Sequence, residues 1–185
     1  MDENALKRFA DAVSKLEVNQ DELDGIRLGT NKNIWECGNL FVIEHQDGQF
    51  GIVDSEGHII VPFGKYGWID RFSHGLARVR TEGDPGRYRG KYMIVDLDPY
   101  REIQGEENIK KYIAEDRKQH PDKYAKWGII NEKGEEVLPL EYDDVWGFYG
   151  KDLDYTTVEK DGKSKRIAFE ILNPELKKTA KTKLL

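Results

Sequence analysis

The sequence KWGIINEKGEEVLPLEYDDVWGF, residues 126–148, decides the fold of this chain. It holds two short apolar runs, separated by residues with special backbone requirements. Gly134 lies between the runs, and glycine adopts positive φ angles without steric cost. Pro139 has no N–H to give to a sheet, so we expect it to end the second run. The stretch therefore predicts two short strands joined by a tight turn.

The same pattern occurs earlier, in residues 50–72. Gly51, Ile52, Gly57 and Pro62 each have an identical counterpart 77 positions later, and Tyr66, Ile69 and Phe72 have similar ones 76 positions later. Weaker copies begin near residues 92 and 165. Units of three short strands cannot bury their apolar faces alone, so the repeat predicts stacked copies.

Turn and helix signals complete the predicted fold. Asp-Gly pairs, as at 161–162, favour tight hairpins because a type I′ turn needs positive φ at both central positions. Apolar residues at helical spacing predict one helix over 2–17, which would cap the array, and one over 104–120. The fold class is thus mainly β with flanking helices: stacked β-meander or hairpin repeats, an N-terminal capping helix and one inserted helix. The expected domains are a helical cap (1–24), a β-repeat domain (38–170) and a basic tail (171–185).

The repeated aromatic residues are expected to pack between units. Repeated aromatics more often fill a core than bind a ligand. The set comprises Tyr66, Trp68, Phe72, Tyr142, Trp146 and Phe148.

Composition points to a cytoplasmic protein. The chain has 185 residues, a net charge of −6 and one cysteine, Cys37, which cannot form an internal disulfide. We see no secretory signal and no run of apolar residues long enough to span a membrane. The acidic balance does not favour general nucleic-acid binding.

No catalytic or metal motif is recognisable. The histidines at positions 45, 58, 74 and 120 lack zinc-ligand spacing, and no nucleophile elbow or phosphate-binding loop is present. We therefore expect no catalytic residues, no metal and no cofactor.

Two charged segments are candidate binding sites. Residues 131–161 hold ten acids against three lysines, and residues 71–91 hold six basic residues against two acids. Aromatic anchors with charges that steer encounter are typical of protein interfaces. The candidate protein-binding residues are Glu141, Asp143, Asp144, Trp146, Asp152 and Asp154. An alternative anion-binding or nucleic-acid-binding stripe comprises Arg78, Arg80, Arg87, Arg89 and Lys91, with tyrosines interleaved.

The segments KWGIINEKGEEVLPLEYDDVWGF and FGIVDSEGHIIVPF, with FSHGLARVR, resemble the WG-repeat family, also called KWG repeats. The resemblance covers roughly residues 38–170, with Phe50 in the place of the first tryptophan. It implies a β-rich repeat found mostly in bacterial proteins. It also implies that there is no common catalytic machinery and that the function is protein–protein interaction.

These observations together favour a non-enzymatic bacterial interaction module that binds another protein. Its sharper form is an inhibitor or immunity protein for a basic partner. Two alternatives stay open: an anion or nucleic-acid binder that uses the stripe from Arg78 to Lys91, and a carboxylate-dependent hydrolase.

Overall fold

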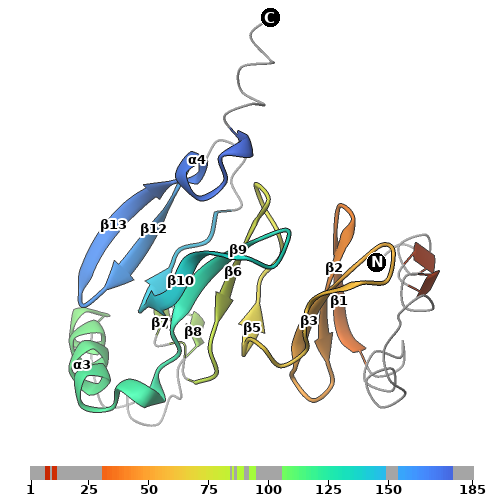
Figure 1. Ribbon diagram of the computed structural model, residues 1–185. Coiled ribbons are helices and arrows are strands. Elements are labelled where there is room, and N and C mark those ends of the chain that lie inside the picture. Colours follow the sequence, from red (N-terminus) through yellow and green to blue (C-terminus); the bar gives the residue numbers. More distant parts are fainter. Residues whose placement is uncertain are drawn as a thin grey trace, which may run out of the picture. The chain divides into compact units, whose positions relative to one another are not determined.

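The computed structural model describes residues 7–8, 10–11, 31–83, 85, 87–89, 92–94, 106–148 and 154–176 (Figure 1). In these residues the fold is mainly β, with antiparallel strands and short connections. The mainly-β fold class predicted from the sequence is confirmed.

The first sheet is a simple meander of four strands in the order β1-β2-β3-β4. Its strands are antiparallel, and its centre is formed by apolar residues of β2 and β3 such as Val42 and Ile52, which are fully buried. The strands are β1 (Asn31–Cys37), β2 (Leu40–His45), β3 (Phe50–Asp54) and β4 (Ile59–Val61).

The second sheet has the order β10-β9-β6-β5. Its strands are β5 (Trp68–Ile69), β6 (Leu76–Arg80), β9 (Trp127–Asn131) and β10 (Glu136–Tyr142). A two-stranded ladder and a helix lie between β6 and β9 in the sequence. These are β7 (Arg87–Arg89), β8 (Tyr92–Ile94) and α3 (Glu106–Gln119), and the short 3-10 helix η2 (Pro121–Lys123) follows.

The third sheet has three described strands in the order β11-β12-β13. They are β11 (Asp144–Val145), β12 (Tyr155–Lys160) and β13 (Lys163–Ala168), and the short helix α4 (Phe169–Leu172) follows β13 directly. The Asp161-Gly162 turn has φ angles of 52° and 71° at its two residues, as the predicted type I′ turn requires.

The two strong sequence repeats adopt the same local structure. The N–H of Asp54 binds the carbonyl of His58, and the N–H of Asn131 binds the carbonyl of Glu135, 77 positions later. In both turns the first side chain accepts hydrogen bonds from the N–H groups two and four residues ahead. The glycines of these turns, Gly57 and Gly134, have φ angles of 95° and 75°. Such local hydrogen bonding by Asp and Asn drives turn formation.

The repeat also holds in the next pair of strands. The N–H of Asp70 binds the carbonyl of Arg78, which joins β5 to β6, and the N–H of Trp146 binds the carbonyl of Thr157, which joins β11 to β12. Asp70 and Trp146 are 76 positions apart, as the sequence alignment requires. β5 therefore corresponds to β11, and β6 corresponds to β12.

By its internal contacts the chain divides into two compact units. One unit comprises Met1–Val79 with Ile130–Glu136, and the other comprises Arg80–Ile129 with Val137–Leu185. The first unit contains the sheet β1–β4. The second unit contains the sheet β11–β13 and the helices α3 and α4.

Two local expectations need correction. Pro139 does not end a strand but lies within β10. Because β10 is an edge strand, one of its sides has no neighbouring strand, and a residue without an N–H is tolerated on that side. The aromatic set does not pack uniformly. Tyr66 and Phe148 are buried as expected, but the side chain of Trp146 is 48% exposed.

The predicted helices have different outcomes. The inserted helix predicted over 104–120 is confirmed as α3. Of the helix predicted over 2–17, residues 7–8 and 10–11 are helical and the others lie outside the described residues. Arg8 donates two hydrogen bonds of 2.8 Å to Glu36 of β1. That this helix caps the repeat array stays a prediction. Among the described residues, no helix has the length and apolar composition that crossing a membrane requires.

Candidate functional site

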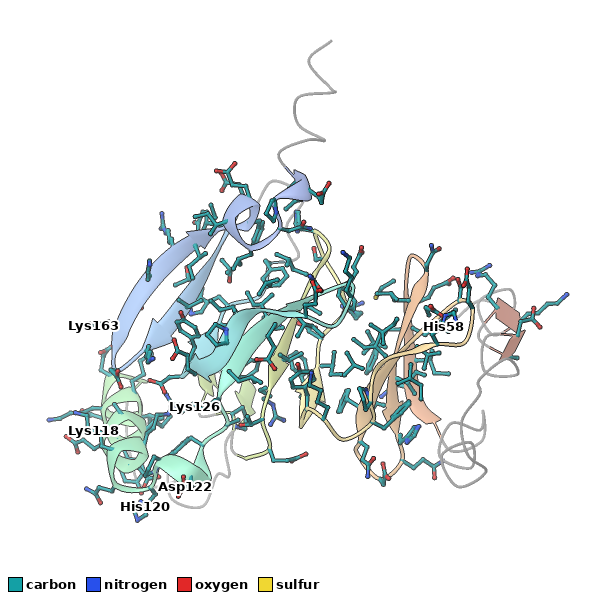
Figure 2. All side chains as sticks on the ribbon, in the orientation of Figure 1. His58, Lys118, His120, Asp122, Lys126 and Lys163 are labelled. Carbon is teal, nitrogen blue, oxygen red and sulfur yellow. The ribbon has the colours of Figure 1, made fainter. Side chains whose placement is uncertain are left out.

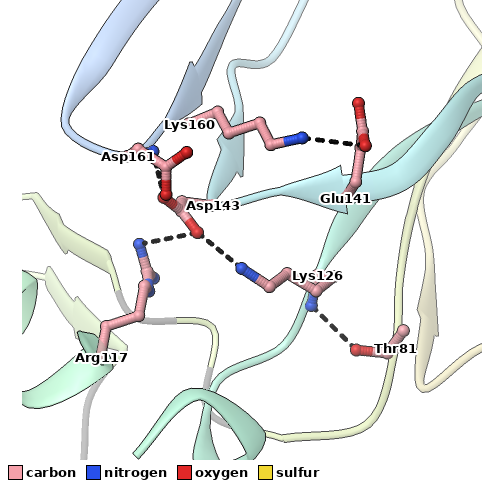
Figure 3. Close-up of polar contacts among 7 residues, drawn as sticks. All are labelled: Thr81, Arg117, Lys126, Glu141, Asp143, Lys160 and Asp161. Atoms are coloured by element: carbon pink, nitrogen blue, oxygen red, sulfur yellow. Dashed lines mark hydrogen bonds and ion pairs between the residues drawn. The ribbon is translucent and has the colours of Figure 1, made fainter. Parts of the chain in front are cut away.

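The acidic segment expected to bind a partner contains one buried carboxylate, Asp143. Its side chain is linked to three separate elements (Figure 3). Lys126 donates a hydrogen bond of 2.8 Å to Oδ1, and Arg117 of α3 lies 3.6 Å from the same oxygen. The N–H of Asp161, in the β12–β13 turn, donates a hydrogen bond of 2.8 Å to Oδ2. Asp143 therefore joins α3 and the segment before β9 to this turn.

The environment of Asp143 keeps it ionised. Burial alone would raise the pKa of this carboxyl group. The hydrogen bonds from Lys126 and from the N–H of Asp161, together with the charge of Arg117, outweigh burial and lower the pKa below its usual value. Asp143 is only 7% exposed, so its side chain is not displayed to solvent as the sequence led us to expect. Its contacts are with Lys126, Arg117 and Asp161 of the same chain.

Arg117 is held on α3 by a second set of contacts. Its guanidinium group lies over the ring of Tyr124, with Cζ 4.9 Å from the ring centroid. The Tyr124 hydroxyl donates a hydrogen bond to Asp116, which also accepts one of 2.8 Å from Lys123. These hydrogen bonds, that of Lys123 above all, lower the pKa of Asp116 to about 2. The end of α3 is thus fixed to η2 and the segment that follows.

A second acid of the expected site is also neutralised. Glu141 of β10 pairs with Lys160 of β12 at 2.9 Å (Figure 3). Of the remaining acids, Asp144 is half-buried, Asp154 is exposed, and Asp152 lies outside the described residues. The surface is consequently less acidic than the sequence indicates.

Trp146 is the aromatic residue of the expected site, and its side chain is exposed to solvent. Among the described residues, the large apolar side chains that are exposed are Trp146 and Ile171. The indole N–H of Trp146 donates a hydrogen bond of 3.0 Å to Glu159, and its carbonyl accepts one of 2.9 Å from Thr156. An exposed indole that is held in place in this way can serve as a rigid contact point for a partner.

A shallow hollow of about 410 Å³ adjoins Trp146 on the third sheet. Period-2 alternation in YTTVEK places Tyr155, Thr157 and Glu159 on one face of β12, whereas Thr156 and Val158 are buried on the other. The guanidinium group of Arg166 lies over the Tyr155 ring, with Cζ 4.7 Å from the centroid. The β12–β13 part of this surface was not among the residues expected from the sequence, although the alternation in β12 could have revealed it. The hollow is lined by Trp146, Gly147, Tyr155, Thr156, Thr157, Ser164, Lys165 and Arg166.

Of the expected basic stripe, the structure describes the side chains of Arg78 and Arg80. Arg78 is 6% exposed and donates a hydrogen bond of 2.7 Å from Nε to Asp70, which is 7% exposed. The Arg78 side chain is therefore buried beside a carboxylate that compensates its charge, and is not displayed to solvent as the stripe requires. Arg80 donates hydrogen bonds to the carbonyls of Thr81 and Gly83. The side chains at 87 and 89, and all of residue 91, lie outside what the structure describes.

The histidines are used in local packing. The ring of His45 stacks on Phe63 with centroids 4.1 Å apart, and burial lowers the pKa of His45. His58 lies 2.9 Å from Asp54, the residue that holds the turn after β3. In the parts of the chain described above, no three His, Cys, Asp or Glu residues gather as metal ligands would.

Comparison with known proteins supports the repeat assignment. Residues 50–83 and 127–163 match the family model described as WG containing repeat. The first segment runs from β3 to beyond β6, and the second runs from β9 to the first residue of β13. Each segment thus holds the last two strands of one sheet and the first two of the next. Neither a curated protein nor a solved structure matches the chain.

Proposed function

Because residues 50–83 and 127–163 of this chain are WG repeats, we propose that the protein is a non-enzymatic protein-binding module. Its contact surface is the open face of the third sheet, centred on Trp146. This surface comprises Trp146, Tyr155, Thr157, Glu159 and Arg166. The family match supports a repeat module, and the exposed indole supports the place of contact.

The exposure of Trp146 is the observation that carries the proposal. In the first repeat the corresponding position is Asp70, which is buried in an ion pair with Arg78. The fold therefore does not need an aromatic residue at this position. Exposing the apolar surface of an indole to water is unfavourable. The hydrogen bond from the Trp146 indole to Glu159 nevertheless holds this side chain at the surface. Tryptophan is enriched among the residues that dominate binding energy, so this position is suited to anchor a partner.

Charge contributes less to the proposed surface than the sequence indicates. Glu141 and Asp143 are neutralised by Lys160, Lys126 and Arg117. The narrower form of the proposal, an inhibitor or immunity protein for a basic partner, would depend on Asp144 and Asp154. The alternative binder using Arg78 gains no support, since that side chain is buried. No observation favours a hydrolase.

Affinity capture with point variants tests the proposal. Tagged wild-type protein, Trp146→Ala and Ile171→Ala are incubated with extract of the source cells, and the retained proteins are quantified by mass spectrometry. Ile171 is the matched control because it is also exposed, at 68%, but lies on α4. Loss of a central tryptophan costs about 2 kcal/mol or more, equivalent to roughly 30-fold in affinity.

We expect a defined partner that the wild type and Ile171→Ala retain and Trp146→Ala loses. Thermal unfolding of each variant verifies that the fold is intact. Equal retention by all three proteins would remove Trp146 as the anchor, and the absence of any enriched protein would count against a binding module. Asp144→Lys with Asp154→Lys tests the narrower form, because it should release a basic partner and leave a neutral one bound.

A further inference from the structure

Among the described residues, the third sheet has no counterpart of β4 and β10, the strands that cover the other two sheets on one edge. β3 is covered on its outer edge by β4, and β9 is covered by β10. Since β5 and β6 correspond to β11 and β12, the strand that corresponds to β9 is β13. Among the described residues, no strand lies on the outer edge of β13, because the chain enters α4 instead of turning back.

The hairpin geometry identifies the backbone groups on this edge. The two-residue turn makes Lys160 and Lys163 a hydrogen-bonded pair, and such pairs alternate along an antiparallel ladder. Lys165 and Ile167 therefore bond to β12, whereas Ser164 and Arg166 direct their N–H and C=O groups outward. On the other side of β12, the carbonyls of residues 157 and 159 bind the N–H groups of residues 146 and 143, as this alternation requires.

These groups form an edge that can accept an added strand. Ser164 and Arg166 together offer two N–H donors and two C=O acceptors, and within the described residues they have no backbone partner. Extended peptides bind to open sheet edges through main-chain hydrogen bonds of this kind. The covered edges of β3 and β9 show that this fold accommodates an antiparallel strand there.

The charge of β13 limits which strand can bind. Lys163, Lys165 and Arg166 are exposed, and the strand contains no acid. Figure 2 labels Lys163 at the turn end of β13. Positively charged residues on an edge strand prevent pairing with a like-charged strand. A second copy of β13 would bring its own three cations, and residues 177–185 of this chain carry four lysines and no acid.

We propose that the outer edge of β13 binds an acidic extended segment of a partner protein as the fourth strand of the third sheet. This inference rests on the proposed function, since it names the kind of segment that the module binds. The bound strand would run antiparallel to β13 and lie beside the hollow that contains Arg166. Acidic side chains on one face of the bound strand would lie beside Lys163 and Lys165, and those on its other face would lie beside Arg166.

Ser164 allows a sharp test. Ser164→Pro removes an N–H that points outward and leaves the β12–β13 hydrogen bonds intact, whereas Ser164→Ala keeps that N–H. The probe is a labelled seven-residue peptide in which glutamate alternates with valine and threonine. Its counterpart has lysine in place of glutamate. Binding is measured by fluorescence anisotropy, and backbone protection is measured by amide hydrogen exchange followed by NMR.

In the free protein we expect the amides of Ser164 and Arg166 to exchange fast and those of Lys165 and Ile167 to exchange slowly. The acidic peptide should protect Ser164 and Arg166, and the lysine peptide should bind at least about tenfold more weakly. Ser164→Pro should weaken the acidic peptide by about tenfold or more, and Ser164→Ala by less than about twofold. Slow exchange at Lys165 in Ser164→Pro verifies that the hairpin is intact.

Each other outcome overturns the inference. Fast and unchanged exchange at Ser164 with the acidic peptide, or equal binding of both peptides, would show that the edge does not select an acidic strand. Protection at Ser164 without peptide would mean that another segment of this chain covers the edge. Protection that grows with protein concentration would identify a second copy. The Trp146 experiment is independent, so it can succeed while the edge fails, or the reverse.

Discussion

Replacing Asp143 by asparagine should destabilise the second unit although the residue lies in the acidic segment that the sequence assigns to the surface. The substitution preserves size and one acceptor oxygen but removes the charge. Asp143 now accepts two hydrogen bonds of 2.8 Å, from Lys126 and from the N–H of Asp161, and it compensates the charge of Arg117 at 3.6 Å. Asparagine can keep the bond from Asp161 but cannot compensate both cations.

The magnitude follows from these contacts. A hydrogen bond to a charged group contributes about 1.5–3 kcal/mol. Removing one partner of a buried ion pair costs about 3–5 kcal/mol. The side chain of Lys126 is 35% exposed, so it can recover part of its hydration, whereas that of Arg117 is 16% exposed and recovers little. We therefore expect the free energy of unfolding to fall by about 2–3 kcal/mol at pH 7.

The pH dependence gives the same interaction a second signature. The pKa of Asp143 is lowered in the folded state, so its contribution to stability is present above the unfolded pKa of about 4. That contribution is lost as the pH falls through the lower, folded pKa. Asparagine does not titrate, so the difference in stability between the wild type and Asp143→Asn should shrink when the pH is lowered from 7 to about 3.

Urea denaturation followed by circular dichroism at both pH values measures these differences. Asp161→Asn is the matched control: it removes a neighbouring negative charge from an exposed turn and keeps the N–H that binds Asp143. The control should change stability by less than about 0.5 kcal/mol. If Asp143→Asn costs no more than the control at pH 7, or costs the same at both pH values, the structural role assigned to Asp143 is refuted.

Two further predictions concern the glycines and the buried ion pair. In urea denaturation, Gly128→Ala should lower the free energy of unfolding by about 3 kcal/mol, because a Cβ at position 128 would lie 2.6 Å from the backbone carbonyl oxygen of Leu138. Gly51→Ala should lower it by only about 1 kcal/mol, because a Cβ at position 51 would lie 2.8 Å from the Phe63 ring, which can move. Arg78→Met alone should lower the free energy of unfolding by about 3–5 kcal/mol. In the Asp70→Asn background the same substitution should cost less, because its buried partner has already lost its charge. If the two losses simply add in this double-mutant cycle, the proposed ion pair is contradicted.

The turns show how much of the fold is determined locally. Asp54 and Asn131 bind backbone N–H groups within four residues of themselves, and glycine supplies the positive φ angle in each turn. Such contacts depend on residues that are neighbours in the sequence, so the repeat pattern predicts them correctly. The hairpin at Asp161 and the inserted helix were predictable for the same reason.

The candidate site was only partly predictable. Trp146 was named in the expected site and is exposed, but the aromatic pattern also placed it among core residues. Asp143 and Arg78 look like surface charges in the sequence, because strand alternation alone does not identify the partner that buries them. Arg117, on the inserted helix, is 26 positions from Asp143, and no local signal connects the two.

The sequence alone thus determined the turns, the strands and the repeat, since backbone geometry and short-range hydrogen bonds select them. Only the tertiary structure decided that Asp143 is buried between two cations, that Trp146 is exposed where Asp70 is not, and that no strand within the described residues covers the outer edge of β13. These properties depend on which distant segments pack together. Burial sets the free energy of a charge, and a sequence position does not specify burial.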